Sequence, residues 1–245
     1  MRENDDYVSV YTRDVELDPS KTCLVVVDLM YATGTRETGL GRLLTEAGRA
    51  EEAEYRFQRI EELVVPNTLR LLEWAREHEM RRVFLTYGSE VADYSDLGPQ
   101  MFELCRSTKN RVGEREHEIL DVLAPRPEER VINKITPSGF TSSPIELIMH
   151  NYGVEDLLFT GVSTNMCVEA TMRDAADRGF GCVLVDDACG ADSEAYHEAA
   201  CLVLRRLYGH IMSTDQVLSR LSGEASDDPP EASPKSEADR SRAHA

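Results

Sequence analysis

The sequence is short of positive charge. Its 27 basic residues face 45 acidic ones, which gives a formal net charge of −18 and a pI near 4.7. Sequence-independent binding of nucleic acids and docking on anionic membranes both require a basic surface. We therefore expect neither nucleic acid nor membrane among the partners, and we interpret the acidity as an aid to solubility.

Long apolar runs are missing as well. Residues 1–14, MRENDDYVSVYTRD, lack the charged-then-apolar pattern of a signal peptide, and no stretch approaches the length that spans a membrane. We therefore predict a cytoplasmic protein with reduced thiols, because disulfides are rare in that compartment.

Cysteine pairs of the metal-binding or redox kind are also absent. No CxxC pair occurs, and no cysteine stands at zinc-finger spacing from a histidine. We predict neither a metal nor another cofactor, and we expect most thiols to pack as small apolar groups. The six cysteines are Cys23, Cys105, Cys167, Cys182, Cys189 and Cys201.

The 245 residues, 41% of them hydrophobic, are enough for one sizeable domain, which we place at 1–222. Short, mostly β-branched runs alternate with longer helical patterns, and several of these patterns end in glycine. This alternation predicts an α/β fold with a doubly wound, mainly parallel six-stranded sheet and helices on both faces. The predicted strands are 23–29, 82–87, 130–134, 156–162, 182–187 and a shorter one at 210–214.

Two segments stand apart from this alternation. Residues 223–245 are rich in Pro, Ser, Ala and charge and lack large apolar side chains, so we predict a disordered acidic tail. The charged insert 34–62 is predicted to form an extra helix over one sheet edge or over the mouth of a site.

Three chemically different side chains fall at the carboxyl ends of predicted strands. Asp28 ends the first strand, Lys134 ends the third, and Cys167 follows the fourth after a short polar loop. Ligands of open α/β sheets bind at this edge. Each residue has an ordinary structural interpretation by itself, but their convergence predicts a reactive site.

Cys167 is predicted to be the nucleophile of this site. It opens a helix, where unpaired N–H groups and the helix dipole favour an anion, so we expect a lowered thiol pKa and donors for an oxyanion. Asp28 is the best available proton acceptor, and Lys134 would keep it ionised. We interpret His150 and His197 as surface or helix-packing residues.

Three segments in the same order resemble the isochorismatase-like cysteine hydrolases. They are VVVDLM at 25–30, INKITPSGF at 132–140 and TGVSTNMCVEATMRDAADRGF at 160–180. The resemblance implies a Rossmann-like isochorismatase fold with an Asp28–Lys134–Cys167 triad. It also implies a cis peptide bond between Val162 and Ser163, with an oxyanion hole at the backbone N–H groups of Ser163 and Cys167.

Departures from the family pattern narrow the range of reactions that we expect. Met30 stands where the family often has Gln, and the segment LTYGSEVADYSDLGP lacks the histidine of metal-dependent nicotinamidases. True isochorismatases lack the cysteine, so vinyl-ether hydrolysis is disfavoured. The candidate substrate-binding residues are Tyr31, Arg36, Tyr87, Phe140 and Asn165, although Arg36 has a surface alternative, Phe140 a packing alternative and Asn165 a helix-capping alternative.

The predicted function is that of a cysteine amidohydrolase. It would cleave a linear amide, ureido or carbamoyl bond of a small molecule through a thioester and release ammonia or an amine. The alternative is a non-catalytic or ester-hydrolysing member of the same fold. The resemblance also implies a homo-oligomer, a dimer or tetramer, and leaves open whether a neighbouring subunit completes the pocket.

Overall fold

The sheet is parallel throughout. The computed structural model describes residues 7–223, and in it six strands are ordered β3-β2-β1-β4-β5-β6. All neighbouring strands are parallel, which confirms the predicted fold class. The predicted tail, 223–245, lies outside the described residues apart from Gly223. The strands are β1 Thr22–Val27, β2 Arg81–Tyr87, β3 Arg130–Lys134, β4 Asp156–Val162, β5 Gly181–Gly190 and β6 His210–Met212.

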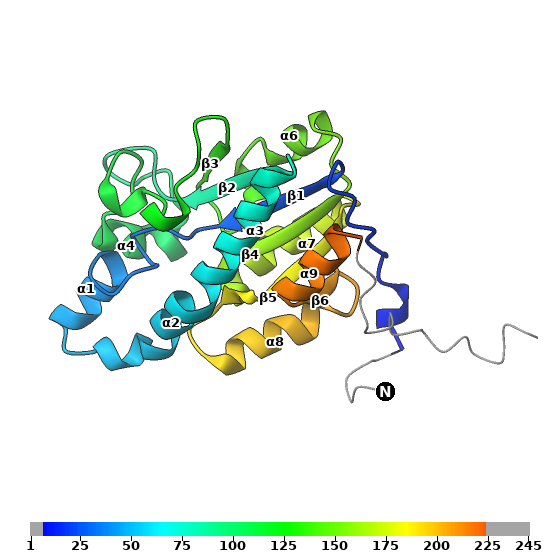
Figure 1. The fold of residues 1–245 in the computed structure, drawn as a ribbon. Helices are drawn as coiled ribbons and strands as arrows, with labels where there is room; N and C mark the ends of the chain where they lie inside the picture. Colours follow the sequence, from blue (N-terminus) through cyan, green and yellow to red (C-terminus); the bar gives the residue numbers. More distant parts are fainter. Residues whose placement is uncertain (1–6, 224–245) are drawn as a thin grey trace, which may run out of the picture.

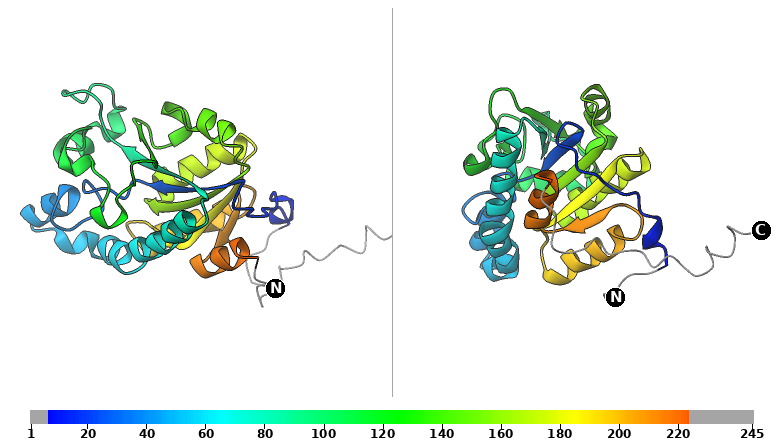
Figure 2. Two further views of the ribbon diagram at one scale, coloured as in Figure 1. Left: turned by 45° about the horizontal axis from the view of Figure 1, so that its top comes forward. Right: turned by 45° about the vertical axis from the view of Figure 1, so that its right-hand side comes forward.

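Alternating residues of the strands pack into two separate hydrophobic cores, one on each face of the sheet. Leu24 and Val26 of β1 pack with α3 and α9 on one face, whereas Val25 and Val27 pack with α6, α7 and α8 on the other. Figures 1 and 2 show the two helical layers with the twisted sheet between them. The helices of these layers are α3 Val65–Glu77, α9 Thr214–Leu221, α6 Ile145–Asn151, α7 Glu169–Asp177 and α8 Glu194–Leu204.

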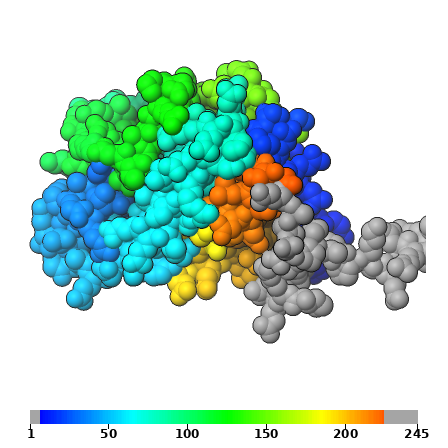
Figure 3. Space-filling view, viewed as in Figure 1, coloured from blue at the N-terminus to red at the C-terminus, as the bar shows by residue number. Residues whose placement is uncertain are grey.

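The charged insert forms several helices rather than one. It contains α1 Gly39–Glu46 and α2 Glu54–Arg59, and α2 runs through a π-helical turn at Ile60–Val64 into α3. The space-filling view shows this stretch, in blue to cyan, as a continuous band on one face of the molecule (Figure 3). The two remaining helices are α4 Pro99–Thr108 and the short α5 Gly139–Ser142.

The carboxyl ends of the strands point toward α1, α2 and α4 (Figure 1). The strand order reverses between β1 and β4, and such a switch point leaves a crevice outside the strand ends. Gly161 lets β4 approach β1 there, since its φ is +115° and a Cβ would lie 2.0 Å from the carbonyl oxygen of Val27. Among residues 7–223, no helix is long and apolar enough to cross a membrane.

Candidate active site

Asp28 stands one residue beyond β1, at the switch point. Its φ of +52° turns the chain out of the strand, a conformation that Asp tolerates better than most residues, and its N–H donates to the carbonyl oxygen of Leu85 over 3.0 Å. The carboxyl group is buried, and its Oδ1 accepts no hydrogen bond from any residue of the described chain. Asp28 therefore does not cap backbone N–H groups, and one of its oxygens is left for chemistry.

Lys134 supplies the counter-charge. It ends β3, is fully buried, and reaches across β2 to place Nζ 2.8 Å from Oδ2 of Asp28. The same Nζ lies 4.4 Å from the ring centroid of Tyr87, where the π-face adds to its stabilisation. A buried ammonium needs such partners, because removing its charge from water costs several kcal/mol.

Cys167 lies in a π-helical turn, Thr164–Val168, which continues into α7. The turn follows β4 directly, and the Val162–Ser163 bond before it is cis, as predicted. The thiol is buried and belongs to the lining of a cavity. The structure therefore places Cys167 at the sheet edge that also holds Asp28 and Lys134, and its role as the nucleophile stays a prediction.

The pKa of the Cys167 thiol differs from the one that the sequence predicts. Burial, followed by the charge of Asp28, raises the pKa of Cys167 to about 12, although Lys134 acts in the opposite direction. Burial likewise raises the pKa of Asp28, while the charge and hydrogen bond of Lys134 and a contact with Cys167 lower it. The expectation of a lowered thiol pKa is wrong, because burial is the largest effect on this group and raises its pKa. Before the reaction, Cys167 is therefore a protonated thiol beside the carboxyl group of Asp28.

A cavity of about 110 Å³ opens over Cys167. Its walls are mainly apolar, with a few polar groups, which is the usual composition of a small-molecule site. Residues of the insert, of α4 and of the loop after β5 join the strand-end residues around it. The described residues that line it are Asp28, Met30, Thr33, Leu40, Arg56, Tyr87, Met101, Leu104, Cys105, Thr108, Asn110, Val162, Ser163, Met166, Cys167 and Asp192.

Of the predicted pocket residues, Tyr87 lines the cavity, whereas Asn165 is not among its described lining residues, so its role in substrate binding stays a prediction. The N–H of Tyr87 contacts Sδ of Met30 at 3.3 Å, so Met30 also borders the cavity in place of the family's Gln. Asn165 is half-buried beside Cys167, its Oδ1 accepts no hydrogen bond among the described residues, and it does not cap the turn.

The structure places the other three pocket candidates away from the cavity lining. Arg36 forms ion pairs with Glu54 at 2.6 Å and Glu61 at 2.9 Å. Phe140 packs in the core beside α7, and the ring of Tyr31 lies under the guanidinium of Arg115. None of the three belongs to the described cavity lining, so their role in substrate binding stays a prediction.

Comparison with known sequences decides the family. A sequence model described as the isochorismatase domain matches residues 22–216, which is most of the chain. The chain belongs to the isochorismatase family. The cavity and the three buried groups occupy the strand ends of an isochorismatase-family fold.

Curated relatives of this isochorismatase-family protein are named ureidoacrylate amidohydrolase RutB. The relative from Pseudomonas syringae pv. syringae (strain B728a) is 34% identical over 108 residues, which is 44% of each chain. Less than half of that relative's length is therefore matched. The relative from Stutzerimonas stutzeri (strain A1501) is 28% identical over 211 residues, covering 80% of this chain and 81% of its own.

Solved structures share the fold. A cysteine hydrolase from Pseudomonas syringae pv. phaseolicola 1448A has a TM-score of 0.72 at 20% identity, covering 86% of this chain and 97% of its own. N-carbamoylsarcosine amidase from Thermoplasma acidophilum has a TM-score of 0.60 at 23% identity, covering 80% and 97%. At these identities the likeness concerns the fold alone.

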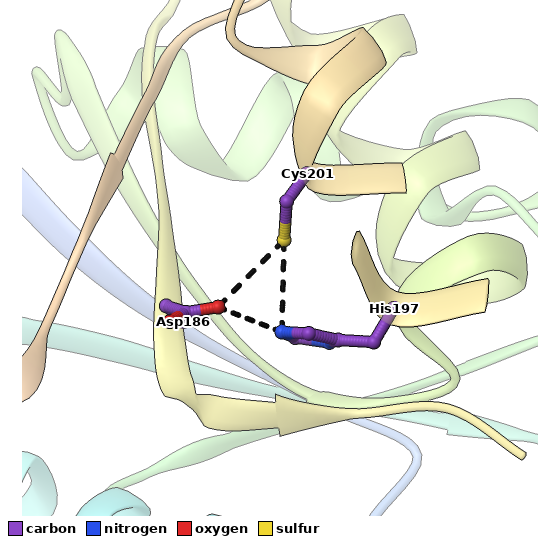
Figure 4. Close-up of side chains that lie close together, drawn as sticks. All are labelled: Asp186, His197 and Cys201. Atoms are coloured by element: carbon purple, nitrogen blue, oxygen red, sulfur yellow. Dashed lines mark hydrogen bonds and ion pairs between the residues drawn. The ribbon is translucent and has the colours of Figure 1, made fainter. Parts of the chain in front are cut away.

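A second cluster, with a buried imidazole and a buried thiol, contacts the cysteine turn of this isochorismatase-family protein. His197 of α8 is buried, with Nδ1 2.8 Å from Oγ1 of Thr164 and Nε2 2.7 Å from Oδ1 of Asp186. The thiol of Cys201 lies 3.6 Å from the same Nε2 (Figure 4). The interpretation of His197 as a surface or helix-packing residue is therefore incomplete, because its ring links β5 to the turn that holds Cys167.

This second cluster offers an imidazole, a carboxylate and a thiol with donor atoms within 4.8 Å of one another. A cation among them would meet a positive charge, since Nη2 of Arg59 lies 2.9 Å from Nε2 of His197. Arg59 also donates to the carbonyl oxygens of Cys189 and Asp186. We therefore interpret the cluster as a hydrogen-bond network that positions the turn, and not as a metal site.

Sequence reasoning missed Arg56. This residue of α2 is buried, lines the cavity and donates from Nη1 to Oγ of Ser163 over 2.7 Å. Nothing in the sequence separates it from its charged neighbours, because the insert alternates glutamates and arginines throughout. Only the fold brings this segment to the carboxyl ends of the strands.

Proposed function

We propose that this isochorismatase-family protein is a cysteine hydrolase that cleaves a linear C–N bond in a small amide, ureido or carbamoyl compound. One observation carries the proposal: the Cys167 thiol lines a cavity beside a carboxyl group that is ion-paired on one oxygen and unpartnered on the other. The name of its curated relatives, ureidoacrylate amidohydrolase, supports this class of bond.

The first half of the proposed reaction forms a thioester. The sulfur of Cys167 attacks the carbonyl carbon while Asp28 takes the thiol proton, so no free thiolate has to exist beforehand. The backbone N–H groups of Ser163 and Cys167 would hold the negative oxygen, as in other acyl-transfer sites. The C–N bond then breaks as Asp28 returns the proton to the leaving nitrogen.

The second half releases the acid. Water attacks the thioester carbon and gives a proton to Asp28, and the sulfur leaves and recovers that proton. Lys134 remains charged throughout and balances the carboxyl group as its charge changes. Each proton taken up by Asp28 is returned, so the cycle closes with one water consumed.

The test is a screen for released ammonia or amine over biuret, ureidoacrylate-like compounds, N-carbamoyl amino acids and simple amides. Turnover of at least one class, lost in Cys167→Ala, is the expected result. Hydrolysis of esters with none of these C–N substrates cleaved would favour the ester-hydrolysing alternative. We also propose a homo-oligomer, which light scattering of the purified full chain would measure directly.

A further inference from the structure

One arginine of the insert connects three segments at the carboxyl ends of the strands. Arg56 of α2 donates from Nε to the carbonyl oxygen of Thr33 over 3.1 Å, in the loop that follows β1. Its Nη1 donates to Oγ of Ser163 over 2.7 Å and to Oδ1 of Asp192 over 2.9 Å, in the segments after β4 and β5. A single side chain therefore joins the insert to the edge of the sheet where the strand order reverses.

The surroundings of Arg56 suit a residue that fixes its neighbours. Its side chain is 5% exposed, and its charge is paired with Asp192, which is half exposed. Hydrogen bonds from a charged donor are roughly twice as strong as neutral ones. A planar guanidinium that donates in different directions also has little freedom to turn. The groups that accept from Arg56 are therefore held firmly relative to α2.

Ser163 is the most informative of the three acceptors. Its backbone N–H, together with that of Cys167, makes the proposed oxyanion hole. The hydroxyl group of Ser163 is only a few bonds away from this N–H, so holding Oγ also limits the direction in which the N–H points. Because an oxyanion donor is effective when it is already aimed at the developing charge, such a restraint would raise the rate of the chemical step.

Arg59 supports the next residue of the same turn. It follows Arg56 by about one helical turn on α2, and its Nη2 lies 2.9 Å from Nε2 of His197. The other ring nitrogen of His197, Nδ1, lies 2.8 Å from Oγ1 of Thr164. The side chains of Ser163 and Thr164 are thus both connected to α2, one directly and the other through an imidazole.

We propose that α2 holds the oxyanion hole in place, and that Arg56 is a positioning residue that directs the N–H of Ser163 toward the substrate oxygen. Arg59 has the same role through His197, with a smaller effect because it acts through a second side chain. The inference rests on the proposed function and adds the segment that keeps its oxyanion donors aimed. Arg56 exchanges no proton with the substrate.

Acyl transfer from p-nitrophenyl acetate tests this role, because it requires the nucleophile and the oxyanion hole but breaks no C–N bond. The sulfur of Cys167 takes the acetyl group and p-nitrophenolate leaves, while Asp28 takes the thiol proton and passes it to solvent. Water then releases acetic acid and restores the thiol. In Arg56→Met, the Cys167-dependent kcat should fall by about 10- to 100-fold, with KM within about threefold. Arg56→Lys should recover part of the loss.

Alkylation of Cys167 by iodoacetamide is the matched reaction that needs no oxyanion hole. The sulfur displaces iodide from carbon, its proton passes to Asp28, and no negative oxygen forms. The rate, followed by mass spectrometry of the peptide that contains Cys167, should stay within about threefold of the wild type in Arg56→Met. Equal losses in alkylation and acyl transfer would indicate a general disturbance of the site and would overturn the proposal.

A double-mutant cycle shows whether Arg56 acts through Ser163. Ser163→Ala keeps the backbone N–H and removes the hydroxyl group, so it should lower kcat about as far as Arg56→Met does. The double variant should then fall little further, whereas losses that multiply would contradict the proposal. Ser163→Ala also tests the contact if Arg56→Met does not fold, which circular dichroism of each variant shows.

Arg42→Met is the matched control within the insert. Arg42 pairs with Glu46 over 2.9 Å on α1, so this variant loses the same charge and should keep the kcat of the wild type. Arg59→Met should lie between the control and Arg56→Met, with kcat lowered by up to about tenfold. A loss in Arg59→Met as small as that of the control would remove Arg59 from the proposal.

The C–N substrates of the screen separate this inference from the proposed function. If acyl transfer depends on Cys167 but no C–N bond is cleaved, the proposed function fails and p-nitrophenyl acetate still measures the role of Arg56. If a C–N substrate is cleaved and Arg56→Met keeps its kcat, the inference fails and the proposed function stands. Acyl transfer that Cys167→Ala retains in full would contradict both.

Discussion

Two clusters of nearly the same composition, each with a buried thiol and a buried basic group, contact the turn that holds Cys167. One contains Asp28, Lys134 and Cys167; the other contains Asp186, His197 and Cys201. Each has a carboxyl group, a basic group and a thiol, and burial raises the pKa of both thiols to about 12. Composition and thiol acidity therefore do not distinguish the reactive cluster from the other one.

The difference lies in access and in the hydrogen bonds of the aspartate. Cys167 lines the cavity, whereas Cys201 lies within α8 and is not among the described lining residues. Burial raises the pKa of Asp28, whereas the hydrogen bond from His197 lowers that of Asp186. We propose that a thiol reacts here only where a cavity delivers substrate and a carboxylate oxygen is still free to take the proton.

Replacing each of the two cysteines separately with alanine should give the largest difference in activity. Cys167→Ala should reduce release of ammonia or amine by about 10⁴-fold or more, because removing a nucleophile removes the covalent route. Cys201→Ala should keep activity within a few-fold and lose about 1 kcal/mol of unfolding free energy through a small cavity. Comparable turnover by Cys167→Ala and the wild type would show that Cys167 is not the nucleophile.

Replacing each of the two aspartates with asparagine should change kcat by different factors, and this difference should be smaller than that between the cysteine variants. Asp28→Asn leaves an amide that cannot take the thiol proton, and kcat should fall by about 10²- to 10⁴-fold. The kcat of Asp186→Asn, measured at the same pH, should fall by less than about tenfold. Circular dichroism of both variants checks that the fold persists, and equal losses in the two would contradict separate roles.

The pH dependence should report Asp28 rather than the thiol. The carboxylate is the proton acceptor, so kcat/KM should rise with pH through the pKa of Asp28, which burial raises above the ordinary 3.8. Above this limb the profile should stay flat through pH 9, because the thiol stays protonated below about 12. A rising limb centred near the ordinary thiol value of 9.0 would instead indicate a preformed thiolate.

His197 should show an intermediate effect. His197→Gln disrupts the link from Asp186 to Thr164, and misplacing the turn by a fraction of an ångström should lower kcat by roughly tenfold. Since His197 takes no proton from substrate, the acid limb of the pH profile should not move. A shifted limb, or the disappearance of the limb, would show that His197 takes part in the chemistry.

Arg36 should have the smallest effect. Its ion pairs with Glu54 and Glu61 lie at the surface of the insert, and such pairs contribute about 1 kcal/mol or less. Arg36→Gln should therefore keep kcat/KM within about twofold, with a small fall in the melting temperature. A tenfold rise in KM would return Arg36 to the list of substrate-binding residues.

The sequence predicts the sheet well because its central strands, such as β1 and β4, are rich in apolar residues and buried on both faces. Strands 130–134 and 156–162 match the structure residue for residue, and 82–87 starts one residue late. Asp28, Lys134 and Cys167 could be found because each follows or ends such a strand, and parallel strands bring their carboxyl ends together. The local pattern and the topology point to the same three residues.

What the sequence could not supply depends on contacts between distant segments. Arg56 joins the site because the insert folds over the cavity, and His197 because α8 packs against the turn after β4. The acidity of Cys167 was predicted with the wrong sign, since a helix start is visible in a sequence but the depth of burial is not. Charge and burial together decide the state of the thiol.

The central claim is that Cys167, and not the similarly placed Cys201, forms the covalent intermediate. Turnover quenched in acid, followed by peptide mapping with mass spectrometry, tests it most directly, because thioesters survive acid. The account predicts an added acyl mass on the peptide that contains Cys167. The same mass on the peptide that contains Cys201, or on any other residue, would contradict it.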